Sequence, residues 1–139
     1  MAKLKANGIE IEYELSGPPA GPPLLLVMGY ASQMTSWPDE FHQALAAAGF
    51  RVIRFDNRDV GLGHKHHGVI PDIRAAAKAI AEGRAPDVPY TLVDMADDAA
   101  ALLDALDIRS AHVAGASMGG MIAQLVAIRH PAKARSLIS

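Results

Sequence analysis

The sequence predicts an α/β fold: a mainly parallel sheet, entered through an antiparallel hairpin and covered by helices on both faces. Short apolar runs alternate along the chain with segments of helical period, which is the order of a βαβ architecture. The run at residues 24–28 is continuously apolar, as expected of a strand buried on both faces. A glycine-flanked serine at residues 115–119 stands where one such run meets a helical segment.

Composition places the chain among ordinary globular proteins. Its 139 residues suit one domain, half of them are apolar, and there is no cysteine for a disulfide or a thiolate metal site. A formal net charge of −2 gives no electrostatic reason to expect a nucleic acid or an anionic membrane surface as a partner. The N-terminus is not an apolar signal core, and no apolar run is long enough to cross a bilayer. We therefore expect a cytoplasmic protein without nucleic-acid or membrane partners.

The first elements form a hairpin and a buried strand. Residues 3–6 and 9–15 flank Asn7-Gly8, a pair that supplies the positive φ angles of a type I′ turn. The second strand alternates isoleucine, tyrosine and leucine with three glutamates, so we expect one of its faces to be wet. A loop rich in glycine and proline, residues 17–23, separates the hairpin from the strand at 24–28.

The middle of the chain is predicted to run helix, strand, helix. Ser36 is expected to cap a helix reaching Ala48 and ended by Gly49, with an apolar face of Phe41, Leu45 and Ala48. A strand at 50–55 follows and closes on Asp56-Asn57-Arg58-Asp59. An alanine-rich helix is expected from Pro71 to about Gly83.

The last third is predicted to run helix, strand, helix, strand. Thr91 and Asp94 form a variant capping box for a helix to about residue 106. Its core face is Leu92, Met95, Ala99, Leu102, Leu103 and Leu106, and its exposed face carries Asp94, Asp97, Asp98 and Asp104. Strands are expected at 111–114 and 134–138, with a helix at 118–130 between them.

Ser117 is the candidate nucleophile. A strand, a sharp turn with serine at the corner, and a helix form the context of a nucleophile elbow. Gly115 and Gly119 fit because side chains at these positions would meet the neighbouring strand and helix. The alternative is an ordinary glycine-rich turn with a helix-capping serine. The loops after Met28 and after Phe55 should converge on Ser117, since parallel strands place their active site at their carboxyl ends.

Four segments together resemble the α/β-hydrolase superfamily, and most closely its methylesterase and proline-iminopeptidase-like esterases. They are residues 26–30, 50–59, 111–120 and 130–138. The resemblance covers essentially the whole chain and implies that residues 1–139 are the N-terminal portion of the fold, with strands one to five and the start of six. The cap and the C-terminal part of the catalytic triad would then be absent.

The resemblance also implies roles for individual residues. Ser117 would attack the carbonyl carbon of a small-molecule carboxylic ester or similar acyl substrate, forming an acyl-enzyme. The backbone N–H groups of Met118 and Tyr30 would form the oxyanion hole, where preset donors stabilise the developing charge. The family often has histidine where this chain has Met28. No cofactor and no metal are expected.

The base and the acid of a triad have no clear candidate here. In the family the position of Asp56 is a structural turn residue, and its use as the acid is a weaker alternative. His112 is expected to be a core or helix-contacting residue, and His130 a helix-end residue. The loop histidines His64, His66 and His67 leave three options open: a solvated loop, a metal site, or a substitute base.

Trp37 either lines the acyl pocket or staples the helix that it starts. A chain ending after the sixth strand should also expose an apolar edge at Val113-Ala114 and Leu137-Ile138. We therefore expect a homo-oligomer, or a complementing C-terminal chain, at that edge.

Three hypotheses follow: a serine esterase that is incomplete in this chain, a non-catalytic binding or oligomerising remnant, and a cofactor-free perhydrolase or haloperoxidase relative.

Overall fold

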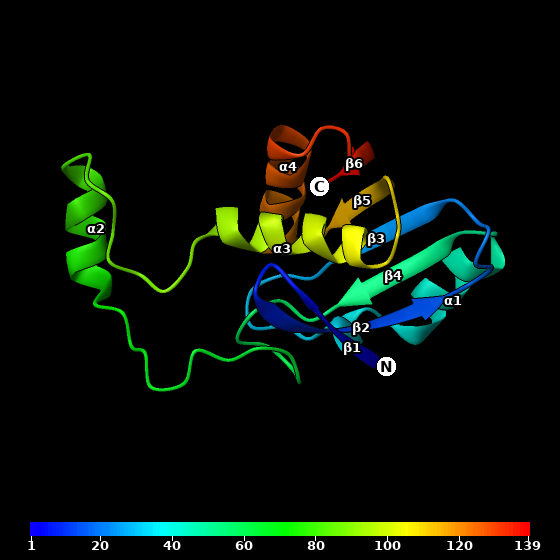
Figure 1. Cartoon of the computed structure of the whole chain (residues 1–139), viewed down its shortest axis with the longest axis horizontal. Coiled ribbons are helices and arrows are strands. Elements are labelled where there is room, and N and C mark those ends of the chain that lie inside the picture. Colours follow the sequence, from blue (N-terminus) through cyan, green and yellow to red (C-terminus); the bar gives the residue numbers. More distant parts are fainter.

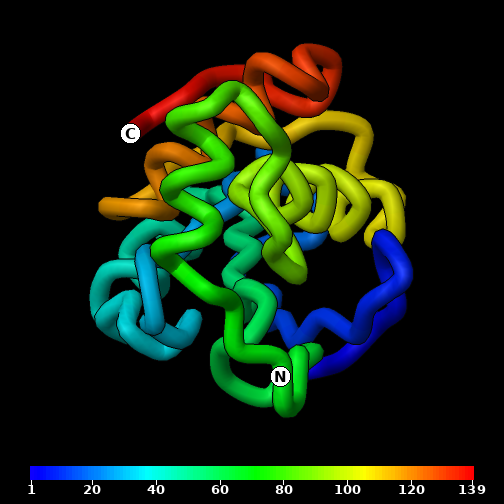
Figure 2. Tube along the Cα trace, turned by 90° about the vertical axis from the view of Figure 1, so that its left-hand side faces the viewer, coloured from blue at the N-terminus to red at the C-terminus, as the bar shows by residue number.

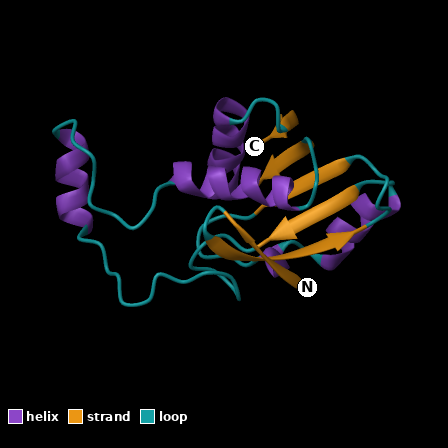
Figure 3. Ribbon diagram, viewed as in Figure 1, coloured by secondary structure: helices purple, strands orange, loops and turns teal.

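The computed structural model describes all residues, Met1–Ser139, as one sheet with helices packed on it and one further helix that projects away from it (Figure 1 and Figure 3). The strands are β1 (Ala2–Ala6), β2 (Ile9–Ser16), β3 (Pro23–Val27), β4 (Arg51–Phe55), β5 (Ala111–Gly115) and β6 (Ala134–Ile138). The helices are α1 (Asp39–Ala47), α2 (Ile73–Ala81), α3 (Leu92–Ala105) and α4 (Met118–Arg129), with a 3₁₀ turn, η1, at Met34–Ser36.

The six strands lie in the order β1-β2-β4-β3-β5-β6. The hairpin β1–β2 is antiparallel and pairs antiparallel with β4, whereas β4, β3, β5 and β6 run parallel to one another. Leu25 of β3 pairs with Ile53 on one side and Val113 on the other. The predicted fold class, a parallel core entered by an antiparallel hairpin, is confirmed.

Helices cover both faces of the sheet, as predicted. On one face, α3 and α4 pack on a large core that includes Leu25, Ile53 and Val113 and the buried side chains of both helices. On the other face, Leu24, Leu26 and Val52 form a smaller cluster covered by α1 and its flanking residues. The alternation of β3 side chains between these clusters explains its continuous apolar sequence.

Helix α2 stands apart from this body (Figure 1). It lies in a long segment between β4 and α3 and projects well beyond the sheet. In Figure 2 the projecting segment points toward the viewer and lies in front of the other elements. Its own N-cap is Asp72, whose carboxylate accepts from the amides of Arg74 and Ala75. Isoleucines at both ends of α2, Ile73 and Ile80, are more than half exposed.

Local signals placed most boundaries correctly. Asn7 and Gly8 both have positive φ in the hairpin turn. The Thr91–Asp94 capping box forms in both directions, and Gly49, at φ +95°, follows the end of α1. The strand predicted at 134–138 is β6. No helix is both long and apolar enough to cross a membrane.

The start of α1 differs from the prediction. Ser36 caps nothing, because it belongs to the 3₁₀ turn η1, and α1 begins after Pro38 without a side-chain cap. Its predicted apolar face is also wrong in part: Phe41 is 44% exposed, while His42 is buried. His42 is held by Ser16 Oγ at 3.2 Å and Asp39 Oδ1 at 3.2 Å, so polar partners replace apolar packing at this position.

Two other predicted surfaces are corrected. Asp98 is not on a solvated stripe: it is 3% exposed, because α3 turns it toward the buried guanidinium of Arg58. The wet face predicted for β2 is also only partial. Glu12 is buried, because the loop at 61–64 packs against β2 at this point. On the other face of β2, Leu15 is 40% exposed.

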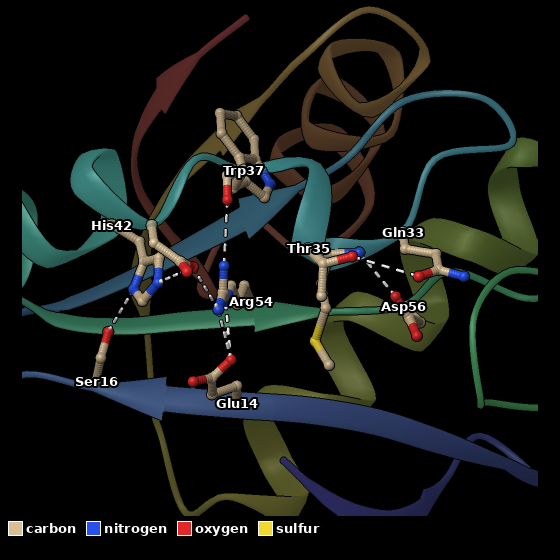
Figure 4. Close-up of polar contacts among 10 residues, drawn as sticks. Glu14, Ser16, Gln33, Thr35, Trp37, His42, Arg54 and Asp56 are labelled. Carbon is tan, nitrogen blue, oxygen red and sulfur yellow. Dashed lines mark hydrogen bonds and ion pairs between the residues drawn. The ribbon is translucent and has the colours of Figure 1, made fainter.

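A polar layer joins α1 to the sheet (Figure 4). Arg54, on β4, is buried and donates to Glu14 of β2 at 2.9 Å and to the Trp37 carbonyl at 3.2 Å. It also pairs with Asp39 at the start of α1. A buried charge is tolerated only when paired and hydrogen-bonded, so these contacts explain how an arginine fits within a central strand.

The sheet ends at β6, which is exposed along most of its length. Leu137 and Ile138 are 41% and 62% exposed. The prediction that Val113 is also exposed is wrong, because α3 and α4 bury it completely.

Candidate active site

Ser117 occupies the corner between β5 and α4. Its backbone has φ 55° and ψ −123°, an unusual conformation for a residue with a side chain. Its hydroxyl makes no capping hydrogen bond to the helix, and the residue is exposed. The alternative of a helix-capping serine therefore does not describe this corner. A strained, exposed serine between strand and helix is the geometry of a nucleophile elbow.

The flanking glycines are sterically required, as predicted. A Cβ on Gly115 would lie 2.1 Å from the carbonyl oxygen of Gly119, and one on Gly119 would lie 2.1 Å from the carbonyl oxygen of Val27. These distances are far below any van der Waals contact, and the obstructing atoms belong to the backbone. The two glycines thus allow the elbow to press against the end of β3.

The loop after β3 lies directly against Ser117. The amide of Ala116 donates to the Val27 carbonyl at 3.1 Å. A Cβ on Gly29 would lie 3.1 Å from Ser117 Cβ and 3.6 Å from its Oγ. The next amide, that of Tyr30, donates to no acceptor of the chain. Met118 is the first residue of α4, where an N–H has no partner within the helix.

Asp56 and Asn57 brace the loops around the site. The Asp56 carboxylate accepts from the amide of Met34 at 2.7 Å (Figure 4). It also accepts from the amide of Leu62 at 3.2 Å. Asp56 and Asn57 are both buried. The Asn57 side-chain amide donates to the Met28 carbonyl at 2.9 Å. These contacts agree with a structural role for Asp56. Asn57 is a site residue that was not predicted, although its position just after a buried strand was an available signal.

A buried ion pair lies behind the site. Arg58 donates to Asp98 through Nε at 2.5 Å and Nη2 at 2.7 Å, and this pairing raises the pKa of Arg58 above its ordinary value. Asn7, in the hairpin turn, donates to the same carboxylate at 2.7 Å. The Tyr90 ring lies 5.4 Å from the guanidinium carbon. No local pattern indicates this cluster, since its members are far apart in the chain.

A cavity of about 440 Å³ opens beside the elbow. Tyr30 and Met118, the predicted sources of the oxyanion-hole amides, both line it. Arg58, Asp59 and Tyr90 form a polar part of its wall. Trp37 does not contribute: it stacks on Phe41 with ring centroids 5.4 Å apart and packs on the α1 face. Of the two alternatives for Trp37, the helix staple is therefore the one observed.

No histidine side chain hydrogen-bonds to Ser117. His112 is half-buried, with Nδ1 2.7 Å from Ser136 Oγ of β6 and its ring against Phe50, the residue before β4, so these two contacts are not with a helix. His130 is the C-cap of α4, as expected, and its Nε2 lies 2.7 Å from Asp97. A hydrogen bond from Arg129 holds the pKa of Asp97 below its ordinary value, and a hydrogen bond with His130 adds to this effect. Burial acts in the opposite direction but is outweighed.

The loop histidines sit at the base of the excursion that carries α2. The rings of His64 and His66 meet edge to face at 4.8 Å, and His66 also contacts Tyr90. His67 is exposed. The structure places no three histidine or carboxylate side chains together in a metal-binding arrangement. Lys65 stabilises the loop by donating to the carbonyls of Val60 and Gly61, each at 2.8 Å.

Comparison with known proteins agrees with this architecture. Residues 22–139 match the family described as "alpha/beta hydrolase fold", and the chain belongs to that family. It is 40% identical over 121 residues to a rhodomycin D methylesterase from a Streptomyces species, covering 87% of this chain. It is 38% identical to the rhodomycin D methylesterase of Streptomyces peucetius over the same share of the chain.

Solved structures lead to the same family. A hydrolase from Pseudomonas aeruginosa superposes with a TM-score of 0.73 at 30% identity, covering 96% of this chain and 42% of that protein. An enol-lactonase from Burkholderia xenovorans gives a TM-score of 0.72 at 26% identity, covering 96% of this chain and 44% of that one. The chain spans 35% of the length of each methylesterase.

Proposed function

We propose that this chain provides the nucleophile and oxyanion hole of a serine esterase. Ser117 attacks the carbonyl carbon of a carboxylic ester, the alcohol leaves, and water later releases the acid from the acyl-enzyme. The oxyanion formed at the attacked carbonyl accepts hydrogen bonds from the amides of Tyr30 and Met118. Two preset amide donors are each worth about 3–4 kcal/mol of barrier in such sites.

The single observation that carries this proposal is the conformation of Ser117. A serine at φ 55° and ψ −123° stores strain, and strain of about 1–3 kcal/mol persists only where surrounding structure enforces it. Gly115, Gly119 and Gly29 allow the backbone to pack closely around this corner, where any side chain would clash. The similarity to two methylesterases supports an ester as the substrate.

The base and the acid are proposed to come from outside residues 1–139. Three histidines have hydrogen-bond partners away from Ser117. His42 contacts Ser16 and Asp39, His112 contacts Ser136, and His130 contacts Asp97. The open strand β6 supports a partner at this edge, because an exposed strand offers unpaired N–H and C=O groups. We propose that the complementing part of the fold, or a second copy of the chain, pairs there.

Reaction with a fluorophosphonate tests the proposal. The reagent mimics an ester, and its adduct at serine resembles the tetrahedral intermediate. Intact mass before and after treatment should show one adduct, mapped by peptide analysis to Ser117. The Ser117→Ala variant should remain unmodified. A folded protein that stays unlabelled with the complementing part present would leave the second hypothesis, a non-catalytic binding module.

A further inference from the structure

The segment that carries α2 is tied to the rest of the protein only at its base. Asp59 accepts a hydrogen bond from the amide of His66 at 2.7 Å, and the rings of His66 and Tyr90 lie 5.1 Å apart. Beyond this base, residues 67–89 make hydrogen bonds and ion pairs only among themselves or with the His66 carbonyl. α2 therefore projects from a fixed base without a polar contact to the sheet or to the other helices (Figure 1).

The base of this segment is also the wall of the cavity beside Ser117. Residues 58–60, where the chain approaches the segment, and residues 90–92, where it returns, all line that cavity. The outward arm, residues 67–72, and the return arm, residues 82–89, extend over about 20 Å and 25 Å at roughly 3.3 Å per residue. Each arm is longer than a cavity of about 440 Å³ is wide, so both can bring α2 over its mouth.

A glycine lies close to each end of α2. Gly68 has a φ of +73° and Gly83 a φ of +70°, and no atom lies within 4 Å of the position that a Cβ would take at either residue. Hinges absorb large changes of φ and ψ within a few residues, and glycine adopts both signs of φ at little cost. The open space around both glycines leaves such rotations unobstructed.

α2 carries an apolar stripe that nothing in the chain covers. Ile73, Ala77 and Ile80 recur at helical spacing and are all exposed, the two isoleucines to 69% and 64%. Other alanines of the helix line a hollow between α2 and its own arms, so the stripe is not used within the segment. On the cavity wall, Tyr30 is 80% exposed and is the one large apolar side chain there that is mostly exposed. Apolar surfaces left open in this way mark interaction sites.

We propose that residues 67–89 form a lid that closes over the cavity beside Ser117, with the stripe of α2 packed on Tyr30. A second copy of the chain is a poorer partner for the stripe, because nine helical residues span only about 14 Å, whereas a standard interface buries about 800 Å² on each side. Attachment through the two arms gives the internal contact a high effective concentration. The lid rests on the proposed function only in regarding the cavity as the place of the substrate, and its movement is measurable without any reaction.

Distances between two spin labels test the lid. The chain has no cysteine, so Arg74→Cys on α2 and Gln33→Cys on the loop after β3 can carry the labels, both at exposed positions outside the proposed contact. Pulsed electron paramagnetic resonance should show two distances, a long one for the open position in this structure and a shorter one for the closed position. A reference pair, Gln33→Cys with the exposed Arg109→Cys, lies outside the moving segment and should show one distance.

Protein variants assign the closed position to residues. Ile73→Ala with Ile80→Ala removes the stripe and keeps α2, because alanine is the stronger helix former. The ratio of closed to open protein should fall about tenfold, since each buried methylene group favours closure by a factor of about four. Tyr30→Ala should act similarly, and combining it with the isoleucine replacements should lower the ratio little further, because the three side chains share one contact. Lys78→Ala, on the exposed polar side of α2, is the control and should leave the ratio unchanged.

The outcomes separate the lid from the proposed function. A single long distance, or a ratio that the isoleucine replacements leave unchanged, would overturn the lid even if Ser117 reacts with the phosphonate. A short distance between chains that carry one label each would also overturn it, because a second copy would then cover the stripe. Two distances with the predicted response, in a protein whose Ser117 never reacts, would support the lid and contradict the esterase proposal.

Discussion

The side chain of Asn57 donates a 2.9 Å hydrogen bond to the carbonyl oxygen of Met28. That carbonyl faces Gly119 of the elbow, where a Cβ would lie 2.8 Å away. Asn57 thus fixes the peptide that leads into Gly29 and Tyr30, while the elbow closes on the same peptide from the other side. One side-chain amide links the loop after β4, the loop after β3 and the start of α4.

Removing this amide should disturb the loop that carries the proposed oxyanion donor. Asn57→Leu leaves the partly buried Met28 carbonyl without its donor, which costs about 1–3 kcal/mol in the free energy of unfolding. The amide resonances of Gly29 and Tyr30 should shift and broaden. Gln33→Ala, an exposed position nearby, is the control and should leave both resonances in place. Unchanged Gly29 and Tyr30 resonances in Asn57→Leu would contradict this positioning role.

Ser117→Gly should stabilise the protein relative to Ser117→Ala. Glycine adopts φ 55° without steric cost, whereas alanine keeps the strain of the serine. Part of the gain is offset by the greater freedom of glycine in the unfolded chain, so we expect a net difference of about 1 kcal/mol. Urea unfolding of the two variants measures it. Equal midpoints and slopes would mean that the elbow is unstrained.

Asp98→Ala should be strongly destabilising. The change leaves Arg58 buried without its counter-ion, and breaking such a pair costs about 3–5 kcal/mol. Asp104→Ala, in the same helix, is the matched control because Asp104 is 67% exposed in its pair with Lys133. Its loss should cost about 0.5 kcal/mol or less. If thermal unfolding ranked the two variants equally, the Arg58–Asp98 pair would not hold α3 to the loop after β4.

Stability should fall in strongly alkaline solution through Tyr90. Burial, with a hydrogen bond to Asp59, raises the pKa of Tyr90 from 10.0 to about 12. The folded state then holds a proton that the unfolded state has lost, so stability is complete below pH 10.0 and decreases as pH rises toward about 12. Tyr90→Phe should lack this component when unfolding free energies are compared across that range. A parallel decline in both proteins would contradict the assignment.

Sequence periodicity predicted the sheet and its helices because local and global signals agree there. The Thr91–Asp94 box and the Asn7-Gly8 turn are local devices, and the apolar run of β3 reflects burial on both faces. The position of Ser117 at the turn between β5 and α4 was likewise predicted from its flanking glycines, Gly115 and Gly119, and its role as nucleophile stays a prediction.

The errors and omissions arose where tertiary contacts override local pattern. In the sequence, Asp98 is one of several acidic residues on the same helix, and its burial is explained only by its contact with Arg58. His42 is likewise buried through Ser16 and Asp39 rather than through apolar neighbours. The cavity wall joins residues from four separate segments, so no single stretch of sequence could reveal it.

The most direct test of the account is the rate and position of phosphonylation in the protein as it stands. The strained elbow and the amides of Tyr30 and Met118 should direct slow labelling to Ser117 even without a paired base, because oxyanion stabilisation persists when triad members are missing. Labelling should accelerate when the complementing part of the fold is added, and should vanish in Ser117→Ala. Labelling spread over other serines, or unchanged in Ser117→Ala, would contradict the assignment of Ser117 as the nucleophile.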